Sequence, residues 1–108
     1  MGKFSRNKGA AAEREVLRII QASGWRDARR THDGRSQAGR NDVIGGPRGC
    51  AVEVKRQEKL NVPAALDQLV RDSQPCDIPV LIHRPSRHGW MATLPLEDLL
   101  PLLKLRES

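Results

Sequence analysis

A dense turn near the middle of this 108-residue chain constrains its fold more than any other feature. Residues 45–49 read Gly-Gly-Pro-Arg-Gly and follow a pair of β-branched residues, which is typical of a strand that ends in a tight turn. Residues 51–55 then alternate with period two, so Glu53 and Lys55 share the face of a second strand opposite the valines. A tight return of the chain is expected to set Asp42 beside both of them.

Two carboxylates beside an ammonium group suit a hard divalent cation. Such cations prefer oxygen ligands, and the ammonium can hold a water or a phosphate oxygen. An amphipathic hairpin with a solvated polar face explains the same alternation equally well. The hairpin by itself therefore leaves both interpretations open.

An acidic residue inside an apolar helix face is the second informative feature. Residues 10–23 predict a helix, because they lack proline and glycine and place Val16, Leu17 and Ile20 on one side. At about 100° per residue, Glu13 falls within this stripe, whereas the other charges of the helix fall outside it. A carboxylate there is costly unless it is paired or bound to a cation, although it could also reach solvent at the end of the stripe.

These features occur along the chain as three motifs, Lys8-Gly-Ala-Ala-Ala-Glu-Arg-Glu15, Asn41-Asp-Val-Ile44 and Val52-Glu-Val-Lys55. The combination resembles the archaeal-type Holliday junction resolvases, a branch of the PD-(D/E)xK nuclease superfamily that also occurs in phages. The resemblance extends from about Lys8 to Leu103. One departure is Asn41, where the superfamily name expects proline, a residue that shapes the backbone rather than the chemistry.

The resemblance implies a site and an activity. By position, Glu13, Asp42 and Glu53 correspond to ligands of Mg²⁺, for which Mn²⁺ can substitute, and Lys55 corresponds to the catalytic lysine. Ser36 and Gln68 match further functional positions less specifically. The implied activity is structure-specific resolution of four-way DNA junctions by paired phosphodiester hydrolysis. Two cuts on opposed strands need two sites related by a twofold axis, which a homodimer provides.

Charge also favours a nucleic-acid partner. The chain carries a net charge of +6. Residues 1–59 hold 14 Lys or Arg against 7 Asp or Glu, whereas residues 60–108 hold 5 against 6. The basic half is the half that carries the candidate site, and residues 1–8 are expected to form a flexible basic arm. The candidate contacts to DNA phosphates are dispersed: Lys3, Arg6, Lys8, Arg29, Arg30, Arg35, Arg40 and Arg56.

The length and the remaining elements predict a single α/β domain over residues 1–108. The expected order is α-β-β-β-α-β-β-α, with a mixed central sheet in a three-layer, restriction-endonuclease-like core. Beyond the motifs above, we predict a strand at 25–32 and an exposed loop at 31–40. A helix is expected from Asn61 to about Ser73, with Pro63 in its first turn, followed by strands at 77–84 and 90–93 that a turn at 85–89 joins. A last helix begins at Leu94, and Pro101 is expected to bend or interrupt it.

Several leucines near the C-terminus have two explanations: they close the core under the sheet, or they form the interface of a homodimer. They are Leu94, Leu96, Leu99, Leu100, Leu102, Leu103 and Leu105.

Cys50 and Cys76 have no partner at zinc-ligand spacing, so we expect two reduced thiols in a cytoplasmic protein of a bacterial, archaeal or phage-infected cell. No apolar run approaches the length of a membrane span, and nothing indicates a small-molecule cofactor.

Two other functions remain open. A nicking or restriction-type nuclease that cuts duplex or flapped DNA would use the same residues on the same core. A non-catalytic basic DNA-binding module is the alternative outside enzymes, although it gives no chemical reason to keep three carboxylates and a lysine.

Overall fold

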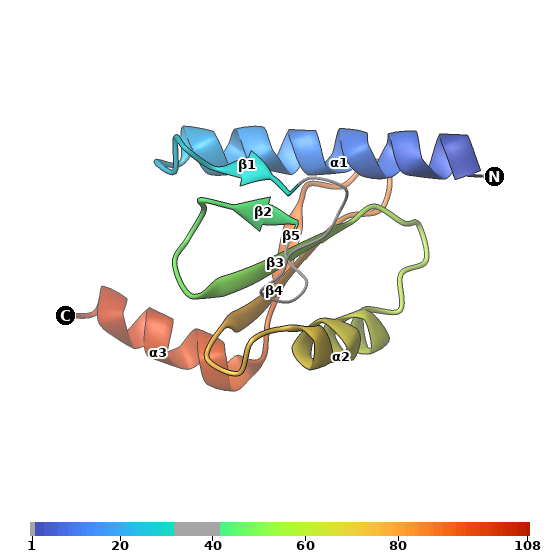
Figure 1. Cartoon of the computed structure of the whole chain (residues 1–108). Helices are drawn as coiled ribbons and strands as arrows, with labels where there is room; N and C mark the ends of the chain where they lie inside the picture. Colours follow the sequence, from blue (N-terminus) through green and yellow to red (C-terminus); the bar gives the residue numbers. More distant parts are fainter. Residues whose placement is uncertain (1, 32–41) are drawn as a thin grey trace.

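The computed structural model describes residues 2–31 and 42–108, with side chains from Gly9 onward. Helices lie on both sides of the strands, with α1 on one side and α2 and α3 on the other (Figure 1). The predicted mixed α/β class is confirmed. In chain order the described elements are α1 (Gly2–Ala22), β1 (Arg29–Arg30), β2 (Val43–Ile44), β3 (Cys50–Lys55), α2 (Val62–Asp72), β4 (Ile78–His83), β5 (Met91–Thr93) and α3 (Leu96–Arg106).

The core is built on both faces of β3. On one face, Val52 and Val54 belong to a buried cluster that also contains residues of α1 and β2. On the other face, Ala51 packs with Leu69 of α2 and Leu81 of β4. The period-two alternation of β3 therefore separates two apolar layers, one for each helix that covers the strand.

The polar face predicted for this strand is not solvated. Glu53 is only 4% exposed, and residues 51–54 are all buried. The strands also pair differently from a hairpin, since β2 pairs antiparallel with β1 and β3 pairs parallel with β4. The interpretation of an ordinary hairpin with a solvated polar face is therefore wrong.

The strands form two hydrogen-bonded sheets within the described residues. β1 and β2 make a two-stranded sheet, and β3-β4-β5 is a mixed sheet in which β4 pairs antiparallel with β5. The strand predicted at 25–32 shrinks to Arg29–Arg30. Its sequence explains the difference, because Trp25 is 41% exposed and Ala28 is the one buried apolar side chain that the segment contributes to the core.

Pro79 lies inside β4, where a proline usually breaks a ladder. The Ile78 N–H donates to the Gly49 carbonyl on the β3 side, so the nitrogen of the next residue points toward the β5 side. β5 reaches only as far as Leu81, through its partner Thr93. Pro79 therefore removes a donor where the ladder has no partner for it.

The helix boundaries follow local signals to different degrees. α2 begins as predicted, because the Asn61 side chain accepts a hydrogen bond from the Ala64 N–H (3.1 Å), and Ser73 caps its end. α1 begins at Gly2, eight residues before the predicted start, so the backbone of the basic segment expected to be an arm continues the helix. Across the described ranges no helix is both long and apolar enough to cross a membrane.

α3 has no buried residue. Of the two effects expected of Pro101, a bend or an interruption, the interruption is wrong, since the helix continues through this residue. The carbonyl that loses its donor belongs to Glu97 in the exposed first turn, where water can replace the missing hydrogen bond. The leucines of this helix do not close the core, because five are largely exposed: Leu96, Leu100, Leu102, Leu103 and Leu105.

Two neighbouring residues of α2 provide a test of the packing. Leu69 is fully buried and Val70 is 48% exposed. We expect Leu69→Ala to lower the free energy of unfolding by about 2–5 kcal/mol, because it leaves a cavity under β4. Val70→Ala should cost less than about 1 kcal/mol. Urea denaturation of both variants checks this, and equal losses would contradict the assigned orientation of α2.

Candidate functional site

Asp42 joins the two sheets. Its N–H donates to the Val52 carbonyl (2.7 Å), and its Oδ2 accepts from the Val54 N–H (2.8 Å). Its own carbonyl accepts from the Thr31 N–H (3.2 Å) beside β1. Three hydrogen bonds therefore fix the backbone and carboxylate of this residue between β1 and β3.

The turn after β2 makes this junction possible. Gly45 has a φ of 75°, and a Cβ at this position would lie 2.7 Å from the Asp27 carbonyl oxygen. Only glycine fits this backbone and this close approach. The glycine-rich turn seen in the sequence thus serves to lay β2 against the segment before β1, which brings Asp42 to the edge of β3.

Electrostatics show which side chains surround Asp42. Burial, the largest effect, raises the pKa of its carboxyl to about 6, and the negative charges of Glu13 and Glu53 raise it further. The hydrogen bond from the Val54 N–H and the charge of Lys55 act in the opposite direction. Glu13, Glu53 and Lys55, the other residues singled out in the sequence, therefore lie near enough to Asp42 for their charges to shift its pKa.

Glu53 and Lys55 project from β3 on the side of α2, by the alternation of the strand. The Lys55 Nζ lies 3.5 Å from Glu53 Oε1. The lysine side chain is 34% exposed and that of the glutamate is 5% exposed, so the ammonium lies at the mouth of the group and the carboxylate at its base.

Glu13 reaches the group from α1. Its neighbours on the helix face, Ala12 and Val16, are buried, which confirms its predicted position within the apolar stripe. It neither pairs with Arg14 or Lys55 nor simply reaches solvent: its Oε2 lies 3.3 Å from Arg30 Nη2 of β1. The ion pair offsets the cost of a carboxylate whose side chain is only 19% exposed.

Glu13 and Glu53 repel the Asp42 carboxylate, and this repulsion adds to burial, the larger effect, in raising the pKa of Asp42. Bound protons or a bound cation would relieve that repulsion, and carboxylate oxygens are the ligands that hard divalent cations prefer. In the parts of the chain that the structure describes, no three acidic, histidine or cysteine side chains lie in an arrangement that could hold a metal ion. The group therefore has the donor chemistry of a cation site, and its side chains would need to draw together around an ion.

The other predicted site residues are placed less centrally. Gln68 is exposed on α2, where it bonds Asp72 (2.9 Å) and Arg71 (2.8 Å) rather than the carboxylate group. Ser36 lies outside the described residues, as do Arg35 and Arg40.

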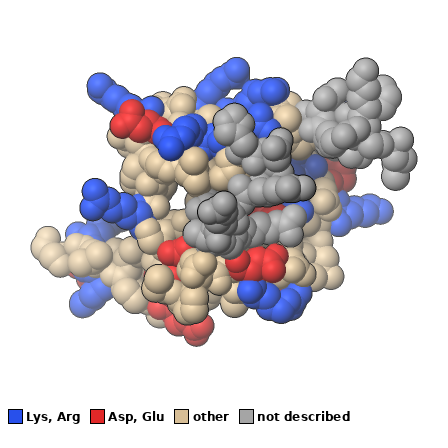
Figure 2. All heavy atoms as spheres, in the orientation of Figure 1, with Lys and Arg blue, Asp and Glu red and all other residues tan. Residues whose placement is uncertain are grey.

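Among the predicted DNA contacts, the side chains of Lys3, Arg6 and Lys8 are not described. Arg29 is exposed on β1, and Arg56 directly follows β3. In Figure 2 the Lys and Arg atoms are spread around the periphery of the face rather than gathered in one patch.

The sequence did not predict the cluster of Glu15, Arg84 and Trp90. Glu15 was expected to be a solvent-facing charge of α1, yet its Oε1 accepts from Trp90 Nε1 (2.9 Å) and Arg84 Nη2 (3.2 Å). These partners lie 75 and 69 residues away in the chain, so no local pattern could indicate them. Neither Cys50 nor Cys76 belongs to a disulfide, in agreement with the predicted thiols.

The raised pKa of Asp42 makes stability depend on pH. An unfolded Asp42 titrates near 3.8 and the folded one near 6, so the folded state holds the proton more tightly and loses stability as pH rises between these values. The loss amounts to about 3 kcal/mol in metal-free buffer. Asp42→Asn cannot ionise and can still accept from Val54, so it should be more stable than the wild type at pH 7 but not at pH 4. Urea denaturation with a chelator checks this, and a difference independent of pH would contradict it.

The chain was compared with protein-family models, with curated proteins and with solved structures, and none of them matches it. No relative therefore assigns a role to any residue of the carboxylate group. The chemistry proposed for it depends on the geometry above and on the motifs in the sequence.

Proposed function

We propose that this protein is a metal-dependent endodeoxyribonuclease that resolves four-way DNA junctions as a homodimer. The observation that carries the proposal is the convergence of Glu13, Asp42, Glu53 and Lys55 from α1, the start of β2 and β3. The same four residues form the motifs that resemble archaeal-type resolvases of the PD-(D/E)xK superfamily. The mixed α/β architecture supports the three-layer, restriction-endonuclease-like core that the resemblance implies.

The donor set fits Mg²⁺, with Mn²⁺ as a substitute. Glu13, Asp42 and Glu53 would hold the ion, because carboxylate oxygens are the ligands that hard divalent cations prefer and the negative charges of Glu13 and Glu53 act on Asp42. A divalent cation there would lower the pKa of a bound water and neutralise charge on the phosphate and on the leaving oxygen.

The protein's own groups supply the rest of the chemistry. Lys55, at the mouth of the group, would orient the attacking water and stabilise the negative charge that develops on the non-bridging oxygens. The hydrogen bond from the Val54 N–H keeps one Asp42 oxygen fixed, so that carboxylate is oriented before substrate binds. The ion pair with Arg30 restrains the Glu13 carboxylate.

Two considerations support a homodimer: the symmetry of junction cleavage and the exposed apolar surface of α3. Cutting opposed strands of a junction symmetrically requires two sites related by a twofold axis. The exposed leucines of α3, which contribute nothing to the core, offer an apolar surface for that contact. Dispersed basic residues, in turn, suit contacts to the phosphate backbone, which position DNA without reading its sequence.

Substitution of the site residues tests the chemistry. We expect Asp42→Asn and Glu53→Gln to abolish junction cleavage while DNA binding is retained or tightened, because each removes a negative charge near phosphate. Lys55→Ala should slow cleavage by about 10²-fold or more, the scale of a positioned proton-transfer or electrostatic group. Gel assays with Mg²⁺ measure cleavage, and calorimetric titration measures metal binding.

Exposed residues of the same types serve as controls, namely Asp67→Asn on α2 and Lys59→Ala after β3. Both should cut junctions at the wild-type rate. Wild-type cleavage by Asp42→Asn would exclude the proposed site. Loss of metal affinity in Lys55→Ala equal to its loss of rate would make the lysine a structural counter-ion instead.

Competition between DNA forms tests the substrate. A four-way junction should displace a labelled junction at far lower concentration than linear duplex of the same sequence, and affinity should fall steeply with salt as phosphate contacts release counterions. Flapped DNA belongs in the same assay. If duplex or flap competed or were cut as well as the junction, the enzyme would be a general or nicking nuclease rather than a resolvase.

A further inference from the structure

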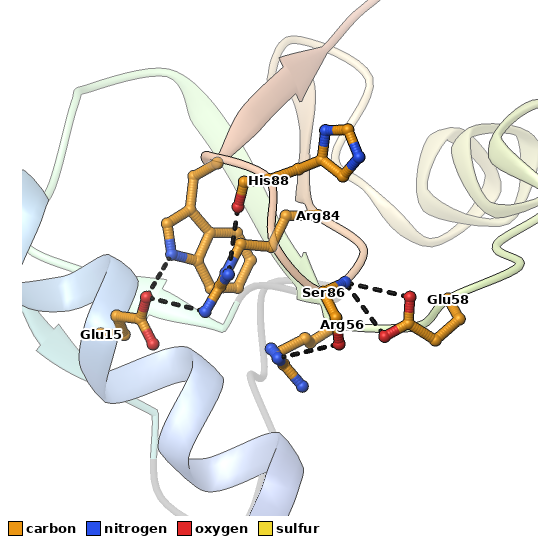
Figure 3. Close-up of polar contacts among 7 residues, drawn as sticks. Glu15, Arg56, Glu58, Arg84, Ser86 and His88 are labelled. Atoms are coloured by element: carbon orange, nitrogen blue, oxygen red, sulfur yellow. Dashed lines mark hydrogen bonds and ion pairs between the residues drawn. The ribbon is translucent and has the colours of Figure 1, made fainter.

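The loop between β4 and β5 is fastened to α1. Arg84 and Trp90, at its two ends, both donate to Glu15, and the Arg84 guanidinium lies 5.0 Å from the centre of the Trp90 ring (Figure 3). Arg84 also donates to the His88 carbonyl (3.1 Å), which closes the loop across its base. The hydrogen bond from Trp90, followed by the charge of Arg84, lowers the pKa of Glu15, so the carboxylate stays ionised and keeps both partners.

Hydrogen-bond donors occur at Ser86 of this loop and at the neighbouring Arg56. The Ser86 N–H lies 3.0 Å from each carboxylate oxygen of Glu58, and Arg56 Nη2 donates to the Ser86 hydroxyl (3.4 Å). Figure 3 shows Ser86 between the Glu58 carboxylate and the Arg56 guanidinium. Ser86 thus holds the Glu58 carboxylate with its N–H and accepts from the Arg56 guanidinium with its hydroxyl. Backbone N–H groups, hydroxyls and guanidinium groups are the donors that bind phosphate in other proteins.

The occupant is an acidic side chain from the same segment as the lysine of the site. Glu58 follows Lys55 by three residues and Arg56 follows it directly, so the donors lie beside the chain as it leaves β3. A carboxylate resembles a phosphodiester in presenting two oxygens that share a negative charge. Glu58 therefore fills a place that a DNA phosphate could take.

The tip of the loop adds a second indication. Arg87 has a φ of 67°, a conformation that favours glycine and costs a bulky residue about 1 kcal/mol. Its exposed side chain therefore puts a cation at the loop tip despite that cost. Strain of this kind is common at binding sites.

We propose that Ser86 and Arg56 form a subsite for a phosphodiester of the DNA strand that passes Lys55, and that Glu58 occupies the Ser86 N–H of this subsite until DNA displaces it. The inference rests on the proposed function, since it assumes a DNA substrate at the carboxylate group. Glu58 then acts as an internal competitor: DNA binds only if its phosphate outcompetes the carboxylate. Glu15, Arg84 and Trp90 act through the loop as positioning residues.

Junction binding by single-charge variants tests this, with Ca²⁺ in place of Mg²⁺ so that no cleavage intervenes. Glu58→Gln should bind a labelled junction about fivefold more tightly, because the competitor is neutral. The matched control Glu107→Gln removes one negative charge from exposed α3 and should change affinity less than about twofold. Arg56→Gln should weaken binding about fivefold and lower the slope of log K against log salt by about one.

Two further variants separate the subsite from general charge effects. In the double variant Arg56→Gln, Glu58→Gln, the gain from removing Glu58 should largely disappear, because the two residues act on the same phosphate. Arg87→Gly suits the backbone better than arginine, so it should weaken junction binding without lowering the thermal midpoint. Thermal unfolding of every variant excludes loss of folding as the cause.

A titration with inorganic phosphate measures anion binding at the subsite in the absence of DNA. The Ser86 amide resonance in a ¹H–¹⁵N spectrum should shift with phosphate at lower concentration in Glu58→Gln than in the wild type. If the wild type cuts junctions but Glu58→Gln behaves like Glu107→Gln and Ser86 does not respond, the subsite is excluded and the nuclease proposal stands. If the wild type binds no junction, the nuclease proposal and the DNA subsite both fail, and the Ser86 response then shows only an anion site.

Discussion

The position of Asp42 between the two sheets is the constraint on which the site depends. The two-stranded sheet of β1 and β2 and the mixed sheet of β3, β4 and β5 share no strand. Hydrogen bonds between Asp42 and the backbone of Val52 and Val54 connect them. Since the residue that joins the sheets also carries a carboxylate, folding and placement of that charge cannot be separated. The same connection brings Arg30 of β1 to Glu13, because β1 is aligned through β2.

Acidic side chains placed between the two sheets lower the stability of the fold. Glu53 is buried and Asp42 is partly so, and like charges within a low-dielectric region repel strongly. A sequence selected for stability alone would place apolar residues at these points of the core, where replacement of buried charges is often neutral or stabilising. The protein instead retains a locally unfavourable arrangement beside a well-packed apolar core, a pattern characteristic of sites that bind or react.

The sequence predicted those features whose causes are local. Period-two alternation located β3, a side-chain cap located the start of α2, and the apolar stripe of α1 correctly placed Glu13 on its inner face. Features that depend on distant partners could not be predicted in this way. The pairing of β2 with β1 rather than β3 depends on how the chain packs across Gly45, and the contact between Glu15 and Trp90 joins opposite ends of the chain. The burial of Glu53 could not be predicted from the alternation of β3, because that pattern does not say which face of the strand other segments cover.

The proline in β4 has a consequence beyond the single chain. A strand segment that extends past its neighbour presents unpaired N–H and C=O groups, on which a strand of another molecule can assemble. β4 extends past β5 at its beginning, and at that point Pro79 offers no N–H and a ring that obstructs an incoming backbone. The residue that seems misplaced in a strand therefore protects the protein against intermolecular β-sheet growth and the aggregation that follows from it.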